Sequence, residues 1–217
     1  MNTDRMRIAA VRNWFELDRS PRPMFRPALH AAPPTCPLPA AGQILLLTGP
    51  SGSGKTTLLR AIHKQAAKLD DARPWIDLAL LSAPNRALIN CLRHSELRDA
   101  MHLLAGVGLA EASLLLKSAR FLSEGQHFRL RVAMGLERAQ RERAGCLLVC
   151  DEFAAPLDDV TAATVAMTIR RAVDVKSGIA MILATGRESL AGALAPDIIA
   201  RCDFGTIAVT TSTTQSK

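Results

Sequence analysis

One short segment constrains the fold of this 217-residue chain more than any other. Residues 49–56 read Gly-Pro-Ser-Gly-Ser-Gly-Lys-Thr and fit the pattern GxxxxGK(S/T) at every required position. The apolar run 43–48 before it has the length of a strand, and residues 55–69 after it carry apolar side chains at helical spacing. A strand, a glycine-rich turn and a helix in this order predict a phosphate-binding loop in an α/β protein. A plain Gly/Ser-rich turn is the less favoured alternative.

The residue types in this segment suit the phosphates of a nucleotide. Its glycines let the backbone curl so that successive N–H groups point into one concavity, and the positive N-terminal end of the helix adds to that field. The Lys55 ammonium would reach the β- and γ-phosphates, and the Thr56 hydroxyl would ligate Mg²⁺. ATP and Mg²⁺ are therefore the expected cofactors. The candidate binding residues of the loop are Gly49, Pro50, Ser51, Gly52, Ser53, Gly54, Lys55, Thr56 and Thr57.

A pair of acidic residues supplies the second half of such a site. Asp151 and Glu152 directly follow the apolar run 147–150, where unpaired charges would be costly as mere core residues. We expect Asp151 to hold the metal through water and Glu152 to act as the general base that polarises the attacking water. An acidic pair after an apolar run is a weak signal alone, but the phosphate-binding loop in the same chain makes it a strong one.

The remaining chain predicts one domain in which strands and helices alternate around an all-helical insertion. We expect an α/β fold with a P-loop NTPase core, a mostly parallel sheet, a small inserted helical subdomain and N-terminal β elements. The expected strands are 75–81, 146–150, 178–185 and one or two within 198–209, and the expected helices are 95–105, 111–117, 126–143 and 161–174. The expected parts of the domain 1–217 are N-terminal strands and a Pro-rich loop (1–41), the core (42–93 and 144–209), the helical subdomain (94–143) and a frayed tail (210–217).

Composition excludes some classes and leaves others open. The chain has no apolar run of the roughly 18 to 20 residues that would span a bilayer, and its N-terminus does not resemble a secretory signal, so we expect a soluble, cytoplasmic protein without a transmembrane segment. The net charge of +7 suits a nucleic-acid or acidic partner, but the arginines are spread out, and the basic cluster at 138–143 also carries Glu137 and Glu142. A solvated helix face is the favoured interpretation there. The five cysteines lack metal-ligand spacing and are expected to be buried thiols rather than ligands or disulfides.

Two further motifs carry a family resemblance. Residues 122–126 read Leu-Ser-Glu-Gly-Gln, and the segment that starts at Asp151 runs on to Leu157-Asp158. In this order the motifs resemble the ABC-type ATPases over about residues 42–205. The resemblance implies a head-to-tail homodimer in which ATP on one phosphate-binding loop is capped by Ser123, the Gly125 amide and Gln126 of the other copy, with Asp158 at the seam. The alternative for Ser123 is a helix N-cap only.

The chain also departs from the transporter-type members of that family. They carry a Gln after the strand expected at 75–81, and here Asn85 and Ser82 are the nearest polar candidates. The family's switch His should fall within 184–188, where Arg187 is the expected occupant, either stabilising γ-phosphate charge or lying exposed at a strand end. The adenine-stacking residue is not a Tyr. Its candidates, with core packing as the default, are Trp14, Phe15 and Phe25.

Other stretches resemble a narrower group of soluble, non-transporter ABC-type ATPases, some of which are fused to acetyltransferase domains. They are residues 85–92, 106–112, 122–133 and 195–199. The sequence thus predicts an ATPase that binds Mg-ATP, dimerises around it and hydrolyses it. The alternatives are the ATPase subunit of a membrane transporter, with a separate membrane partner, and a nucleotide-gated binding module of nucleic-acid metabolism with little turnover.

Overall fold

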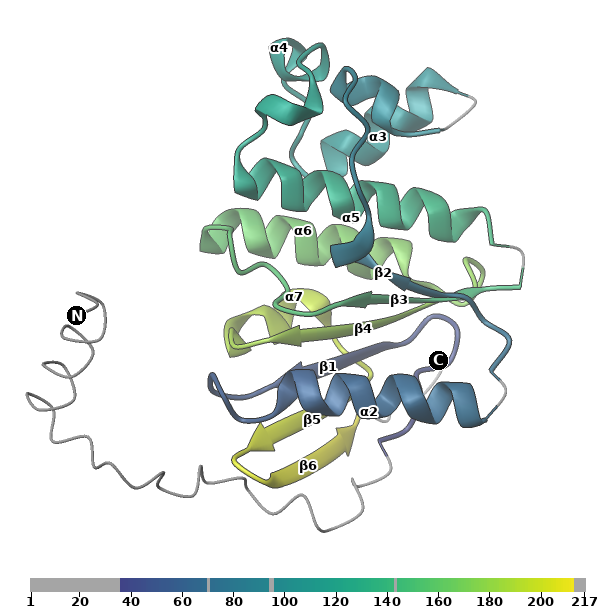
Figure 1. The fold of residues 1–217 in the computed structure, drawn as a ribbon, viewed down its shortest axis with the longest axis vertical. Helices are drawn as coiled ribbons and strands as arrows, with labels where there is room; N and C mark the ends of the chain where they lie inside the picture. The colour runs from purple at the N-terminus through teal and green to yellow at the C-terminus, as the bar shows by residue number, and fades with distance from the viewer. Residues whose placement is uncertain (1–35, 70, 94–95, 143, 213–217) are drawn as a thin grey trace, which may run out of the picture. The chain divides into compact units, whose positions relative to one another are not determined.

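Six short, largely apolar strands pair into one sheet within the described part of the chain, in the order β2-β3-β4-β1-β5-β6 (Figure 1). The computed structural model describes residues 36–69, 71–93, 96–142 and 144–212, which fall within one compact unit, residues 33–217. The strands are β1 (Ile44–Thr48), β2 (Trp75–Asp77), β3 (Cys146–Cys150), β4 (Ile179–Thr185), β5 (Ile198–Asp203) and β6 (Thr206–Thr211).

The first five strands are all parallel, and β6 pairs antiparallel with β5 as a hairpin. The three central strands β1, β3 and β4 are buried along their whole length. A strand that is covered on both faces reads as a continuous apolar run rather than an alternating one. This is why these three strands could be predicted from the sequence almost to the residue. Their carboxyl ends lie at one edge of the sheet, and β4 separates β1 from β3.

Helices cover both faces of the sheet (Figure 1). They are α2 (Lys55–Lys68), α3 (Leu97–Gly106), α4 (Ala112–Leu115), α5 (Glu124–Gln140), α6 (Asp159–Ala172) and α7 (Ala191–Leu194), with 3-10 turns at Leu78–Leu80, Leu88–Cys91, Ala119–Phe121 and Glu188–Leu190. Because side chains alternate along a strand, β1 sends Leu45 and Leu47 to the core beneath α2, and Ile44 and Leu46 to the core shared with α3, α5, α6 and α7. The predicted mostly parallel α/β sheet is confirmed.

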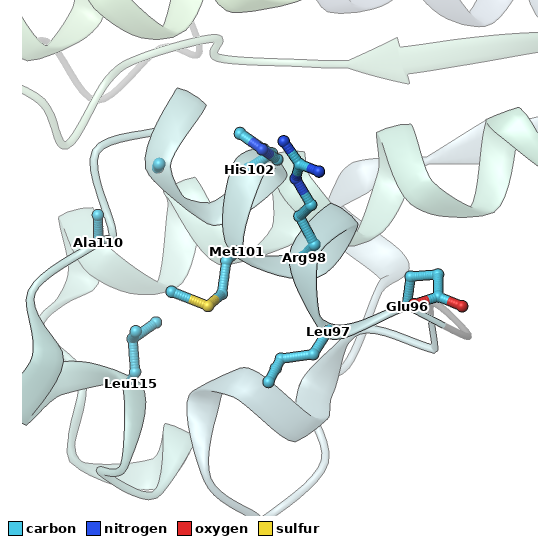
Figure 2. A pocket seen from close by; sticks show the side chains of 8 residues that line it. Glu96, Leu97, Arg98, Met101, His102, Ala110 and Leu115 are labelled. Atoms are coloured by element: carbon cyan, nitrogen blue, oxygen red, sulfur yellow. The ribbon is translucent and has the colours of Figure 1, made fainter.

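The segment between β2 and β3 is helical, as predicted, and its helices share one core with the sheet. A pocket of about 590 Å³ lies beside α3 and α4. Figure 2 shows Leu97, Met101 and Leu115 around it. Its lining residues are Glu96, Leu97, Arg98, Met101, His102, Ala105, Ala110 and Leu115.

Three sequence expectations need correction. The strand expected at 75–81 ends at Asp77, because the Asp77 carboxylate accepts the backbone N–H of Ala79 at 2.8 Å and caps a 3-10 turn. The tail expected to fray from residue 210 is still paired there, since β6 runs to Thr211. Glu137, placed on a solvated face, is buried on α5, where it accepts the backbone N–H of Arg93 and pairs with Arg141.

Other expectations fall outside the described residues. The N-terminal strands, the adenine-stacking candidates and most of the Pro-rich loop belong to residues 1–35, and the end of the tail to residues 213–217. In the ranges that the structure does describe, no helix is long and apolar enough to cross a membrane.

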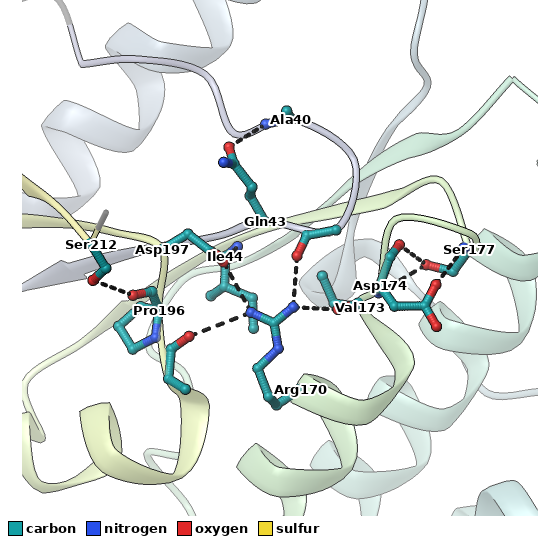
Figure 3. A network of polar contacts seen from close by, with 12 residues as sticks. Ala40, Gln43, Ile44, Arg170, Val173, Asp174, Ser177, Pro196, Asp197 and Ser212 are labelled. Carbon is teal, nitrogen blue, oxygen red and sulfur yellow. Dashed lines mark hydrogen bonds and ion pairs between the residues drawn. The ribbon is translucent and has the colours of Figure 1, made fainter. Parts of the chain in front are cut away.

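Arg170 joins three elements at the edge of the sheet where β1 begins (Figure 3). Its guanidinium pairs with Asp197 at 2.9 Å and donates to the carbonyl oxygens of Gly42, at 2.6 Å, and Val173. Asp197 in turn accepts the backbone N–H of Ile44 at 2.8 Å. The planar fork of an arginine can serve several acceptors at once, so this one side chain fixes α6 against the starts of β1 and β5.

Candidate nucleotide-binding site

The predicted site residues gather at the carboxyl edge of the sheet. β1 leads into the loop 49–54, β3 leads into Asp151 and Glu152, and β4 leads into Gly186 and Arg187. In open α/β sheets ligands bind outside the carboxyl ends of the strands, because loops and helix N-termini converge there. The fold therefore brings together three segments that are far apart in the sequence, residues 49–54, 151–152 and 186–187.

The loop before α2 has the conformation of an anion-binding turn. Gly49, Gly52 and Gly54 have φ values of 137°, 77° and 104°, a backbone region that favours glycine. α2 starts after Gly54, and within the described residues no side chain caps its first N–H groups. The uncapped amides and the helix dipole together favour a negatively charged group at this position.

Lys55 and Ser53 line the same loop. The Lys55 ammonium donates to the carbonyl oxygens of Gly49 and Pro50, both at 2.8 Å, and so lies over the loop. The Ser53 hydroxyl is buried and has no hydrogen-bond partner among the described residues. An orphaned buried hydroxyl, free amides and a nearby ammonium form a donor set that fits a phosphate group.

The loop and the acidic pair meet directly. The Thr56 hydroxyl donates to Oδ2 of Asp151 at 2.8 Å, and Oδ1 of Asp151 accepts the backbone N–H of Glu152 at 3.0 Å. A hydroxyl and a carboxylate oxygen at this separation are suitable Mg²⁺ ligands, since Mg²⁺ in nucleotide sites takes one or two protein ligands and completes its shell with phosphates and waters. In the described ranges, no group of three or more His, Cys, Asp or Glu side chains could hold a metal ion by itself.

Residues 151–158 form a run of turns that is held in an unusual conformation. Glu152 and Ala154 have positive φ values of 53° and 60°, which cost free energy for residues with a Cβ. The Phe153 side chain is buried, and its backbone N–H donates to the carbonyl oxygen of Ala184 at 2.7 Å. The surrounding structure thus fixes the backbone that carries Glu152.

The signature-like turn lies beside this segment. Ser123 and Gln126 form a capping box at the start of α5, in which Ser123 Oγ accepts the Gln126 N–H at 3.3 Å and Gln126 Oε1 accepts the Ser123 N–H at 2.9 Å. A Cβ on Gly125 would lie 3.1 Å from the Pro156 carbonyl oxygen, so the two segments are in close contact. The N-cap interpretation of Ser123 is confirmed, and phosphate binding by the same residues stays a prediction.

Asp158 and Asn85 both have partners within their own chain. The Asp158 carboxylate caps α6 by accepting the Thr161 N–H at 2.9 Å, which lowers the pKa of that carboxyl below its usual value. The Asn85 side chain accepts the Ser118 hydroxyl at 2.7 Å, in the helical segment. Sequence reasoning missed Asp77, which ends β2 at the same edge of the sheet as Asp151. The signal available in the sequence was an acidic residue inside the expected strand 75–81, where an unpaired charge would be costly.

Burial also decides the chemistry of the cysteines. All five are buried free thiols, as expected. Desolvation raises the pKa of Cys36 and Cys146 to about 11, and raises that of Cys91, Cys150 and Cys202. A thiol is nucleophilic only as the thiolate, so these side chains are unreactive at neutral pH, including Cys150 beside the acidic pair.

Comparison with known proteins agrees with the sequence resemblance. A protein-family model described as an AAA domain matches residues 40–194, which is most of the chain. No curated protein matches the sequence. Two solved structures with similar folds are ABC-type ATPases.

The first is CbiO1 from Clostridium perfringens, part of the ABC transporter complex CbiONQ; it is 19% identical, has a TM-score of 0.53 and covers 77% of this chain and 76% of its own. The second is the ATP-binding cassette MJ0796, solved as a dimer in a post-hydrolysis state bound to ADP and Pi; it is 18% identical, has a TM-score of 0.56 and covers 80% of this chain and 87% of its own. The chain therefore shares the fold of ABC-type ATPase domains.

Proposed function

Because the chain belongs to the AAA domain family, we propose that it is an ATPase that binds Mg-ATP, pairs with a second copy around the nucleotide and hydrolyses ATP to ADP and phosphate. One observation carries this proposal. The Thr56 hydroxyl and the Asp151 carboxylate are 2.8 Å apart, although Thr56 lies in the first turn of α2 and Asp151 directly follows β3. That contact joins a phosphate-binding loop to a carboxylate, which is the arrangement a Mg-nucleotide requires.

Each residue of the site then has a specific task. The uncapped amides at the start of α2 bind the phosphates, and Lys55 exchanges its two carbonyl acceptors for phosphate oxygens. Thr56 and Asp151 would hold Mg²⁺, which would supply positive charge to offset that of the β- and γ-phosphates. Glu152 orients the attacking water and accepts its proton, and the fixed backbone of residues 151–158 limits where its carboxylate can lie.

The second copy would complete the site from the other side. The start of α5 offers the Ser123 hydroxyl and helix N-terminal amides, and Ser123 is exposed. The proposed pairing sets this helix end against the γ-phosphate of the other copy, with Asp158 at the seam. The helix dipole favours the negative charge of the phosphate there.

Two substitutions test the proposal on the full chain. Lys55→Ala should weaken Mg-ATP binding, because it removes the ammonium that neutralises the phosphates. Glu152→Gln should leave binding intact, reduce turnover by about 10² to 10⁴-fold as expected for loss of a general base, and trap an ATP-stable dimer. Binding is measured with a fluorescent ATP analogue, turnover by phosphate release and dimer formation by light scattering.

Thr164→Ala is a matched control, because Thr164 is an exposed position on α6 whose hydroxyl bonds only the carbonyl oxygen of its own helix. It should leave binding and turnover unchanged. Undiminished hydrolysis in Glu152→Gln would exclude Glu152 as the base. Absence of both ATP binding and pairing in the parent chain would exclude the whole proposal.

One surface favours a second candidate function, nucleotide-gated binding of nucleic acid. Residues 55–68 of α2 contain no Asp or Glu, and the helix presents the exposed side chains of Arg60, Lys64 and Lys68 at four-residue spacing. Residues four apart lie on one face of a helix. None of the three has an ion-pair partner among the described residues. Such a basic stripe suits the phosphate backbone of a nucleic acid.

A salt titration distinguishes this second function from a solvated helix face. If α2 binds nucleic acid, the affinity for a single-stranded oligonucleotide should fall steeply between about 50 and 200 mM salt, and replacing Arg60, Lys64 and Lys68 with Ala should flatten that dependence. The control replaces three exposed basic residues that also lack an ion-pair partner among the described residues, namely Arg138 on α5, Arg171 on α6 and Lys176 after α6. No measurable binding at 50 mM salt would exclude the second function and leave the ATPase proposal untouched.

A further inference from the structure

The side chain of Arg187 turns toward the 151–158 segment. Its Nη2 donates to the carbonyl oxygen of Leu157 at 2.6 Å, and its Nη1 lies 3.6 Å from the exposed carboxylate of Asp159. The bond to Leu157 is a charge-assisted hydrogen bond, about twice as strong as a neutral one. The Arg187 side chain is 32% exposed, so solvent competes less for this bond than it would at a fully exposed position.

The backbone of Arg187 is tied to the same segment by a second route. The Thr185 hydroxyl donates to the carbonyl oxygen of Phe153 at 3.1 Å and accepts the backbone N–H of Arg187 at 3.1 Å. The end of β4 therefore holds the segment near its start, through Phe153, and near its end, through Leu157. Between these two points lies Ala154, one of the two residues of the segment with a positive φ. Strained conformations of this kind persist only when several contacts enforce them.

The 151–158 segment connects the two parts of the proposed site. At its start, Glu152 lies beside Asp151, and at its end Pro156 and Leu157 contact Gly125 at the beginning of α5. A contact that fixes Leu157 therefore affects both the residue that activates water and the surface offered to a second copy.

We propose that Arg187 is a positioning residue that couples ATP hydrolysis to pairing by fixing the 151–158 segment, rather than a group that binds the γ-phosphate. This inference rests on the proposed function. It is an alternative to the sequence-based interpretation of Arg187 as a γ-phosphate ligand, which stays a prediction: Nη2 is held by the Leu157 carbonyl oxygen, whereas Nη1 is buried without a hydrogen-bond partner among the described residues. It predicts that the residue acts on turnover and pairing but not on the affinity of one copy for ATP.

Arg187→Ala in the full chain tests this. Hydrogen exchange of the nucleotide-free protein should be about tenfold or more faster at the Phe153 and Leu157 amides, with β1 unchanged, because loss of a charged hydrogen bond is worth about a factor of ten or more. The maximal rate of ATP hydrolysis should fall about tenfold or more. When Arg187→Ala is added to Glu152→Gln, the ATP concentration that half-saturates pairing should be higher than for Glu152→Gln alone. The affinity of a single copy for a fluorescent ATP analogue should stay within about twofold of that of the parent chain.

Two further variants test the inference even if Arg187→Ala is unstable. Asp159→Ala removes the exposed ion pair and keeps the Leu157 bond, so it should leave hydrolysis, pairing and exchange unchanged. Arg187→Lys keeps one donor that can reach the Leu157 carbonyl and should restore part of the hydrolysis rate.

A loss of monomer ATP affinity as large as the loss of turnover, with exchange at 151–158 unchanged, would overturn the inference, since Arg187 would then act on the nucleotide. Normal turnover and pairing in Arg187→Ala would also overturn it. Failure of the parent chain to bind ATP is a separate result, which would remove the proposed function itself.

Discussion

At residue 49 the backbone has a φ of 137° and passes so close to β5 that an added Cβ would overlap the carbonyl oxygen of Cys202. The motif requires glycine at the first position of the loop, and the structure supplies a second reason for it besides the turn. Gly52 differs, because its φ is 77° but an added Cβ would meet nothing within 4 Å. A comparison of the two glycines therefore separates the free-energy cost of placing a Cβ at positive φ from the cost of its clash with the Cys202 carbonyl oxygen.

Gly49→Ala should destabilise the protein and abolish ATP binding, because the loop must move away from β5 to make room for the methyl group. Gly52→Ala, the matched control, should cost only the strain of a left-handed residue, about 1 to 2 kcal/mol. Urea unfolding and binding of a fluorescent ATP analogue measure both effects. Equal losses of stability in the two variants would show that the contact with Cys202 does not matter.

Among the elements, α5 carries both a structural cap and a proposed binding surface on one turn. Its capping box satisfies helix N–H groups with Ser123 and Gln126, whichever function the turn has.

The short length of β2 also has a local cause. A three-residue strand at the sheet edge gives way to a 3-10 turn as soon as an aspartate can accept a backbone N–H.

Substitutions at Ser123 separate the two roles. Ser123→Ala should lower the free energy of unfolding by about 1 kcal/mol, because it removes the cap. Ser123→Asp should retain the cap, since aspartate is an equally good N-cap, yet prevent ATP-dependent pairing by repelling the phosphate. Urea unfolding and light scattering with ATP provide the two readouts. Normal pairing of Ser123→Asp would mean that the turn does not face a nucleotide.

For the whole molecule, the Arg170 network shows how distant parts of the chain are fixed without involving the nucleotide site. Arg170 connects the end of α6 to the starts of β1 and β5 (Figure 3). The predicted phosphate-binding loop follows the other end of β1. This stabilising network thus lies at one end of the sheet and the candidate nucleotide-binding site at the other, a division between the two ends.

Arg170→Ala should lower the free energy of unfolding by about 2 to 3 kcal/mol, because Asp197 and several carbonyl oxygens lose a charged donor. Arg170→Lys should cost less but not restore full stability, since a single ammonium cannot reproduce the planar fork. ATP affinity should be unchanged in both at temperatures where they are folded. A fall in ATP affinity without a fall in stability would contradict this division.

The buried thiols predict how stability depends on pH. Their folded pKa values are raised, to about 11 for Cys36 and Cys146, so the unfolded chain loses thiol protons at lower pH than the folded one. The free energy of unfolding should therefore fall as the pH rises from about 8.5, the pKa of a free thiol, toward 11. Urea unfolding under reducing conditions measures this, and Cys146→Ala should reduce the slope. The chain has no Tyr to titrate in the same range. A flat profile would contradict the thiol contribution.

Local sequence patterns were sufficient to predict a feature wherever that feature depends only on neighbouring residues in the chain. The phosphate-binding loop, the acidic pair and the three central strands were predictable because glycine placement, adjacent carboxylates and unbroken apolar runs are properties of neighbouring residues. Ser123 was recognisable as an N-cap for the same reason. The sequence by itself thus determined the fold class and the candidate residues of both halves of the site.

Only the tertiary structure decided which of these residues meet. The Thr56–Asp151 contact joins residues 95 positions apart, and the direction of the Arg187 side chain depends on a carbonyl oxygen 30 residues away in the chain. The burial of Glu137 likewise depends on a backbone N–H 44 residues away. Such contacts depend on how strands are ordered in the sheet and how helices pack on it, and a periodicity of two or of 3.6 residues carries no information about that order.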